Sequence, residues 1–276
     1  MGLRISTNVA AINTQRNMAN SQRMMQSTSA QLASGSRINK AADDAAGLAI
    51  SETMRGQIRS AIQARRNAND GISLVQTAEG GLGEVSNILI RMRELGIQAA
   101  SDTLGDNERS LVQTEISQLK DEVNRIAKST RWNSTNLLDG SSPTFDFQIG
   151  IFATENDKIT FDASKNTATL DALGIDGIDY STRDGARGSI STIEMAQQGV
   201  NSMRANLGAL QNRMTSTVDT LAITEENLAA ANSRIRDTDV AQATSEMTRN
   251  QVLLQAGVAT LAQANQSTQL ALKLIG

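Results

Sequence analysis

The sequence predicts a mainly α-helical protein: an elongated antiparallel helical bundle with coiled-coil seams, a pair of terminal helices and a small β-hairpin region. Three observations predict this fold class. Apolar residues recur every seven positions over long stretches, which is typical of packed helices. A single proline, Pro143, leaves those stretches free of helix breakers. Only four Phe, one Trp and one Tyr are present, and the remaining apolar residues suit helix–helix seams better than a thick core.

The longest seven-residue repeat predicts one helix from Ser189 to Arg236. At 1.5 Å per residue this helix would be about 70 Å long. The repeat runs without a miss, and the intermediate positions complete the apolar seam of a coiled coil. Its members are Ile193, Val200, Leu207, Met214, Leu221, Leu228 and Ile235.

Two further repeats predict a pair of helices beside the long one. A short break at residues 104–107 separates them, and Asp106 or Asn107 would cap the returning helix. Because the break is short, we expect the two helices to pack antiparallel. The first repeat is Val75, Ala78, Leu82, Val85, Leu89, Met92, Gly96 and Ala99, and the second is Val112, Ile116, Leu119, Val123 and Ile126.

The periodicity changes in the middle of the chain. Residues 145–151 and 158–162 alternate apolar and polar side chains, which predicts a small hairpin, and a glycine-containing loop region follows over residues 171–188. We therefore predict three parts. These are a terminal coiled-coil domain (1–42 with 236–276), a helical bundle (43–140 with 188–235) and a short hairpin-and-loop insertion (141–187).

The two ends of the chain avoid acidic residues. Asp43 is the first acid and Glu246 the last. Both ends repeat apolar residues with helical spacing, but their seams are rich in Ala, Gln and Asn and would bury little apolar area alone. We expect these helices to be disordered in a free monomer and ordered on assembly. The seam residues are Ile5, Val9 and Ile12, followed by Val240, Met247, Leu254, Val258, Leu261 and Leu272.

The composition argues against catalysis. The chain has no Cys and no His, so it lacks thiol chemistry, the commonest metal ligand and the usual general base. Asp43 and Asp44 form the one paired-carboxylate site, and we interpret Asp43 as the cap of a helix that begins at Ala45. The glycines at residues 80–83 lack the lysine and the preceding strand of a phosphate-binding loop. We predict no enzyme activity, no cofactor and no metal site.

No feature predicts nucleic-acid binding or membrane insertion. The net charge is −3 and aromatic residues are scarce, so the basic pair Arg65-Arg66 favours solvated or interface charges. No segment approaches the roughly 20 apolar residues of a membrane span. The first residues lack the apolar core of a secretory signal peptide, although the acid-free, Arg-containing N-terminus superficially resembles an organelle transit peptide.

Five motifs in order along the chain resemble those of bacterial flagellins. They are Ser36–Ser51, Asn69–Glu79, Arg93–Ala100, Leu207–Arg213 and Glu226–Asp239. The resemblance covers about residues 1–140 and 188–276. It implies a structural subunit that is exported unfolded by the flagellar type III apparatus and polymerises into the filament for swimming motility. On this interpretation the N-terminus is an export and assembly segment rather than a transit peptide.

The resemblance also implies a location, partners and contact residues. The terminal helices would line the channel of a secreted, extracellular filament as an inner tube, with the helical bundle around them. The partners would be other flagellin subunits, filament cap and hook–filament junction proteins, an export chaperone and the export apparatus. In the family, positions matching Arg91, Leu95 and Glu115 contact neighbouring subunits and an animal innate immune receptor. Ile90 and Gly96 depart from the strongly recognised members, and packing between subunits would alone explain these residues. Only residues 141–188 stand where longer flagellins insert outer domains, so we expect a thin filament.

Two alternatives stay open from the sequence. A flagellin-like junction protein between hook and filament would occupy a single spot at the filament base. A coiled-coil signalling or receptor-cytoplasmic domain would form a soluble helical dimer with ordered terminal helices.

Overall fold

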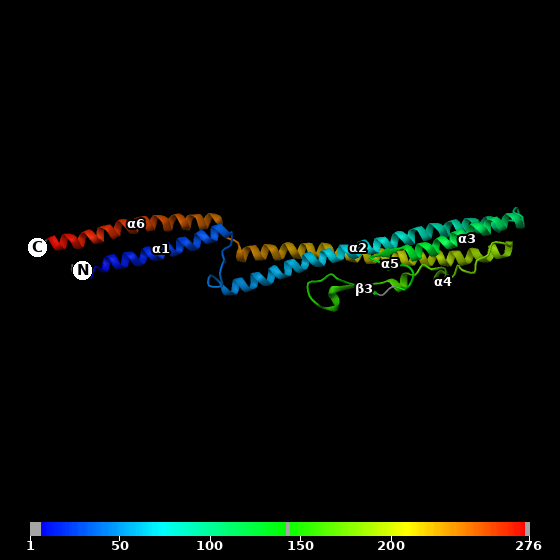
Figure 1. Cartoon of the computed structure of the whole chain (residues 1–276), viewed down its shortest axis with the longest axis horizontal. Helices are drawn as coiled ribbons and strands as arrows, with labels where there is room; N and C mark the ends of the chain where they lie inside the picture. The colour runs from blue at the N-terminus through cyan, green and yellow to red at the C-terminus, as the bar shows by residue number, and fades with distance from the viewer. Residues whose placement is uncertain (1–6, 142–143, 274–276) are drawn as a thin grey trace. The chain divides into compact units, whose positions relative to one another are not determined.

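A computed structural model describes residues 7–141 and 144–273, with side chains described through residue 266 (Figure 1). It is mainly α-helical, which confirms the predicted fold class. The helices are α1 (Val9–Ser34), α2 (Ala45–Ala99), α3 (Asp106–Ser129), the single turn α4 (Leu170–Leu173), α5 (Arg183–Arg236) and α6 (Val240–Lys273). The strands are β1 (Arg131–Trp132), β2 (Thr135–Asn136), β3 (Thr144–Gln148) and β4 (Lys158–Asp162), with short 3-10 turns at Glu155–Asp157 and Ala163–Asn166.

The chain divides into two compact units, which we name the terminal unit and the central unit. The terminal unit consists of the described residues within Met1–Gln57 and Asn227–Gly276, and the central unit of those within Ile58–Glu226. The long helices α2 and α5 each contribute residues to both units. The terminal unit also contains α1 and α6, and the central unit contains α3, α4 and the strands.

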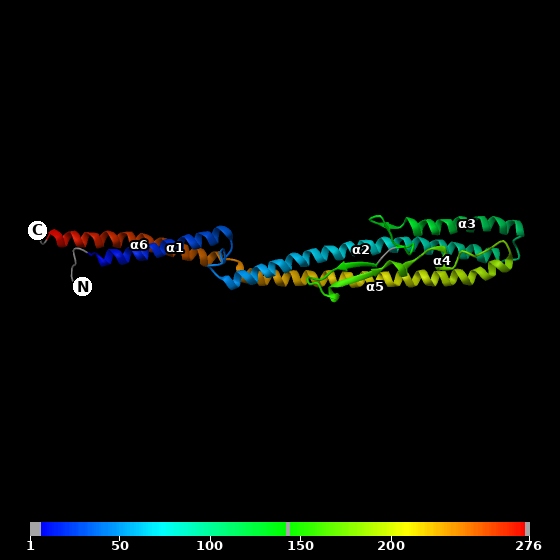
Figure 2. The ribbon, with the colours of Figure 1, turned by 60° about the horizontal axis from the view of Figure 1, so that its bottom comes forward.

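The core of the central unit lies between α2, α3 and α5, which run side by side (Figure 2). Apolar residues at heptad spacing on all three helices face one another, because this spacing gathers them on one side of each helix. The predicted seam residues Val85, Leu89, Met92, Val112, Ile116, Leu207, Met214 and Leu221 are buried. Leu119 and Leu228 are half-buried.

The long helix α5 begins at Arg183, six residues before the predicted start, and ends at Arg236 as predicted. The prediction that Gly185 and Gly188 belong to a loop is wrong, because both lie in α5. The hydroxyl of Thr182 accepts a hydrogen bond from the backbone N–H of Gly185 at 3.1 Å, so Thr182 caps the helix. A Cβ on Gly185 would lie 2.8 Å from the carbonyl oxygen of Asp179, which explains a glycine in this first turn.

The caps of α2 and α3 differ from the predictions. Asp44, not Asp43, caps α2, because its Oδ1 accepts from the backbone N–H of Gly47 at 2.8 Å. Asp43 instead accepts from the backbone N–H groups of residues 39 and 40 and closes the preceding turn. The cap position of α3 is Gly105, without a side-chain cap. Asp106 is the first residue of α3, and its carboxylate pairs with Arg109 at 2.8 Å.

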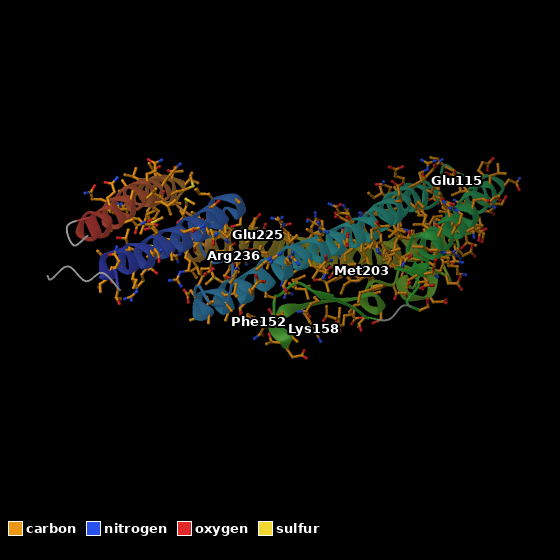
Figure 3. The ribbon with its side chains drawn as sticks, turned by 60° about the vertical axis from the view of Figure 1, so that its left-hand side comes forward. Glu115, Phe152, Lys158, Met203, Glu225 and Arg236 are labelled. Carbon is orange, nitrogen blue, oxygen red and sulfur yellow. The ribbon has the colours of Figure 1, made fainter. Side chains whose placement is uncertain are left out.

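The predicted hairpin is confirmed by β3 and β4, which pair antiparallel. Phe145 lies opposite Phe161, with ring centroids 6.0 Å apart, and the end of the hairpin carries the exposed Phe152 (Figure 3). The sequence prediction missed the two-residue strands β1 and β2. Their turn places Asn133 and Ser134 at positive φ, and strands this short show no alternation to detect.

The single tyrosine joins the segment before α5 to α2. Tyr180 is fully buried, and its hydroxyl donates a hydrogen bond to the carbonyl oxygen of Met92 at 3.0 Å. A Cβ on Gly96 would lie 2.9 Å from that hydroxyl oxygen. Gly96 therefore makes the room that the tyrosine ring occupies. Burial raises the pKa of Tyr180 to about 12.

We expect Gly96→Ala to lower the free energy of unfolding by about 1–3 kcal/mol, because the added methyl group overpacks the ring of Tyr180. Gly80→Ala is the matched control within α2, since a Cβ there meets no atom within 4 Å. We expect this control to raise stability by about 0.5–1 kcal/mol. Denaturant unfolding measures both variants. Equal stability of the two would contradict the close packing of Gly96 against Tyr180.

We expect Tyr180 to ionise about two pH units above a free tyrosine, whose pKa is about 10. Because the folded pKa is raised, the stabilisation is complete below about pH 10 and is lost as the pH rises toward 12. The chain has one tyrosine, so ultraviolet absorbance of the phenolate reports this group alone. A titration midpoint near pH 10 for Tyr180 in the folded protein would disprove its burial. The urea-unfolded chain is the control, in which the tyrosine should ionise near pH 10.

Candidate functional site

The terminal unit holds the two acid-poor ends of the chain as one helix pair. In Figures 1 and 2, α1 and α6 lie side by side. At one end of the pair, the backbone N–H of Arg37 donates to the carbonyl of Arg236 at 2.6 Å, and that of Thr238 donates to Gly35 at 3.0 Å. At the other end, the side-chain amide of Asn8 donates to the carbonyl of Ala264 at 3.0 Å. Polar contacts therefore fix both ends of the pair.

Few residues are buried between α1 and α6. In the described part of the two helices, the buried side chains are Ala11, Thr28, Ala243 and Asn250, all of them small or polar. Burying a full Val, Leu or Ile side chain contributes roughly 1.5–3 kcal/mol, whereas alanine contributes far less. This interface is therefore weak for helices of 26 and 34 residues.

The large apolar side chains of the pair are exposed instead. Among the predicted residues, Val9, Ile12, Val240 and Val258 are 48–61% exposed, while Met247, Leu254 and Leu261 are half-buried. Ile5 and the side chain of Leu272 lie outside the described residues. Three further apolar residues of the pair are also exposed, namely Met24, Val252 and Leu253. The heptad repeat does not predict them, because they lie off the heptad rows. These exposed apolar side chains make the pair a candidate interaction site.

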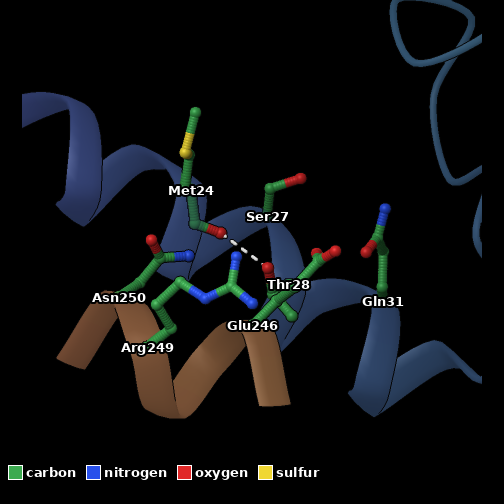
Figure 4. Close-up of a pocket in the computed structure, with 7 residues that line it drawn as sticks. All are labelled: Met24, Ser27, Thr28, Gln31, Glu246, Arg249 and Asn250. Atoms are coloured by element: carbon green, nitrogen blue, oxygen red, sulfur yellow. Dashed lines mark hydrogen bonds between the residues drawn. The ribbon is translucent and has the colours of Figure 1, made fainter. Parts of the chain in front are cut away.

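A shallow groove of about 410 Å³ lies between α1 and α6 (Figure 4). Its lining is mostly polar, and the hydroxyl of Thr28 donates to the carbonyl of Met24 on its own helix at 2.9 Å. The groove is lined by Met24, Ser27, Thr28 and Gln31 of α1 and by Glu246, Arg249 and Asn250 of α6. Among these residues, the hydroxyl of Thr28 bonds to a backbone carbonyl of its own helix rather than to the carboxylate of Glu246.

A second candidate surface lies on α2 and α3 of the central unit, around Arg91. The guanidinium of Arg91 donates to Oε1 of Glu115 from Nη2 at 2.9 Å and from Nε at 3.1 Å, and it also contacts Glu94 at 3.3 Å (Figure 3 labels Glu115). The hydrogen bond to Glu115, together with its charge, raises the pKa of Arg91. Leu95 is only 2% exposed and lies in the core. Arg91 and Glu115 are therefore the residues that a partner can reach.

Three exposed apolar side chains on the same two helices were not singled out as contact residues from the sequence. Ile90 and Ile97 lie on α2 and Leu111 lies on α3, and all three are exposed. The sequence signal that could identify these three residues is that they are apolar but lie outside the heptad rows that form the core. The exposed surface of α2 and α3 therefore carries apolar side chains as well as the Arg91–Glu115 ion pair.

The described residues contain no group of three or more potential metal-ligating side chains. Within the same part of the chain, no helix is long and apolar enough to cross a membrane.

Comparison with known protein families gives two matches. The model of the bacterial flagellin N-terminal helical region matches residues 5–143, and that of the bacterial flagellin C-terminal helical region matches residues 190–275. The chain belongs to the bacterial flagellin family. Family membership argues against the signalling-domain alternative.

Individual relatives agree with this assignment over nearly the whole chain. A flagellin of Halalkalibacterium halodurans is 43% identical over 98% of this chain and 99% of its own length. A flagellar filament core protein of Brachyspira hyodysenteriae is also 43% identical, with the same coverage. The crystal structure of Bacillus cereus flagellin superposes with a TM-score of 0.51 at 29% identity, covering 60% of this chain and 94% of that one.

Proposed function

We propose that this flagellin is a structural subunit that polymerises into the bacterial flagellar filament for swimming motility and has no catalytic role. The exposed apolar side chains of the α1/α6 pair carry the proposal. The pair buries mainly small and polar residues within the subunit, so its larger apolar groups are available to neighbouring copies. Covering them on assembly removes apolar surface from water.

The mechanism is coupled folding and binding. Helices with so thin a shared interface are marginal alone, because nucleation is costly and little area is buried. We expect them to be disordered in the free subunit and to fold when neighbours supply the missing core. In this proposal, residues 1–42 with 236–276 form the inner tube, residues 43–140 with 188–235 the surrounding layer, and residues 141–187 a small outer insertion.

Export and the remaining partners belong to the same proposal. A chain without Cys and with a single Pro has no disulfide and only one X–Pro bond to isomerise slowly during refolding. These properties suit a protein that is threaded unfolded through the flagellar type III apparatus and folds in the extracellular filament. The further partners are an export chaperone, the filament cap and the hook–filament junction proteins.

The exposed ion pair of Arg91 and Glu115 is proposed as a contact between subunits, and this packing alone suffices to explain these residues; recognition by an animal innate immune receptor is the alternative role of the same positions. The exposure of the ion pair, and of Ile90, Ile97 and Leu111 on the same two helices, supports a contact role. Leu95 would act indirectly, by supporting the helix from the core.

We expect Val258→Gln to raise the concentration needed for filament assembly about tenfold or more, because neighbouring copies would no longer cover an apolar side chain there. Val258 is 53% exposed in the subunit, so the subunit's own helical content should not change. Ala243→Gln is the contrasting variant, since Ala243 is buried between α1 and α6; a longer side chain there should separate the two helices once they fold in the filament, and so should also weaken assembly without changing the helical content of the free subunit. Assembly is followed by sedimentation and helical content by circular dichroism. Assembly of Val258→Gln at the parent concentration would refute the proposed role of this face.

Antibody labelling distinguishes a filament subunit from a junction protein. We expect labelling along the whole filament, since filament growth uses many copies of one subunit. Labelling confined to the filament base would identify the chain as a junction protein instead.

A further inference from the structure

Three ion pairs join α2 to α5 inside the central unit, and their polarity alternates. Nη1 of Arg65 lies 3.1 Å from Oε2 of Glu225. Further along the helices, Oε1 of Glu79 lies 3.8 Å from Nη2 of Arg204. Nη2 of Arg93 lies 4.0 Å from Oε2 of Glu194. The charges on α2 therefore read positive, negative, positive, and those on α5 read negative, positive, negative.

The three charged positions on α2 are spaced 14 residues apart, which is two heptads. They therefore occupy the same position of the heptad repeat and fall on the same side of the seam. Ile72 and Ser86 lie midway between these positions, one heptad from each charged neighbour, and both are uncharged. The charge pattern on α2 thus repeats only after 28 residues, four times the length of the apolar repeat.

Apolar residues alone would only weakly distinguish the native register of α2 against α5 from registers shifted by whole heptads. Sliding α2 by whole heptads keeps apolar rows facing apolar rows, so slipped pairings retain much of the hydrophobic contact. The correct register nevertheless matters for packing. A Cβ on Gly71 would lie 3.0 Å from Cε of Met214, and a two-heptad slip would bring the larger Val85 to that place.

We propose that the alternating ion pairs select the register of α2 against α5 by penalising slipped pairings. A slip of one heptad places uncharged residues opposite the α5 charges and loses all three pairs. A slip of two heptads in one direction sets Glu79 against Glu225 and Arg93 against Arg204. The opposite slip sets Arg65 against Arg204 and Glu79 against Glu194. Every pairing formed by a two-heptad slip is a like-charge pairing.

The surroundings of these pairs strengthen the effect. Their side chains are 26–51% exposed, and the Nε atoms of Arg93 and Arg204 are shielded from solvent. Partly desolvated charges interact more strongly and are screened less by salt than fully exposed ones. Exposed ion pairs add little net stability, so the main effect is on which pairing forms.

Swapping the middle pair tests the proposal. Glu79→Arg with Arg204→Glu keeps three opposite-charge pairs in the native register and leaves the amino-acid composition and the net charge unchanged. It also makes all three α2 charges positive and all three α5 charges negative, so both two-heptad slips become attractive. From typical pair energies, we expect the ratio of slipped to native pairing to rise about tenfold or more.

The register is read from the distance between two spin labels. The chain has no cysteine, so Gln76→Cys and Ala205→Cys place single labels at exposed positions of α2 and α5. A two-heptad slip moves these labels by about 21 Å along the helix axis. The full-length labelled chain is unfolded in denaturant, diluted to refold, and measured at once.

We expect the parent to refold to one distance and the swapped variant to two. Glu79→Gln with Arg204→Gln is the matched control, because it removes the native middle pair without making slipped pairings attractive, and its slipped fraction should lie well below that of the swap. A swapped variant that refolds to the single parent distance would overturn the proposal. So would a glutamine variant that slips as often as the swap, or a swapped variant that fails to regain the parent's helicity.

Discussion

The interface between α1 and α6 buries too little apolar surface to hold two helices of this length together. Ala11, Thr28, Ala243 and Asn250 form its buried part, and valine and isoleucine side chains on both helices remain in water. A helix pair with this composition depends on polar contacts at its ends and on whatever covers its exposed faces. The function proposed for this flagellin follows from that shortage, because neighbouring copies are the apolar surface that the subunit lacks.

The central unit has the opposite character. Leu82, Val85 and Leu89 on α2 are completely buried, as are Ile193 and Val200 on α5. Tyr180 and Gly96 add a specific fit, and a buried arginine, Arg109, donates to the carbonyls of Ala99 and Ser101 and so closes the turn between α2 and α3. This unit contains the core that the terminal unit lacks. A stable unit joined to a weakly packed pair suits a protein that must stay soluble alone and still polymerise.

Much of the fold is predictable because its signals are periodic. The heptad rows on α2, α3 and α5 bury most of the residues they predict, with Leu119 and Leu228 half-buried, and the alternation around Phe145 and Phe161 gives the hairpin. The wrong predictions concern helix ends, where a single hydrogen bond determines which residue is the cap. At the start of α2 that residue is Asp44 rather than Asp43. The candidate surface was predicted only in part. Exposed residues off the heptad rows, such as Met24 and Leu253, follow no repeat, and the burial of Leu95 depends on packing between helices.

Amide hydrogen exchange tests the central claim most directly. We expect fast exchange in α1 and α6 of the free subunit, strong protection of the same helices in assembled filaments, and protection of the central segments of α2 and α5 in both states. Equal, strong protection of α1 and α6 before and after assembly would contradict this claim, because the terminal pair would then be stable without its neighbours.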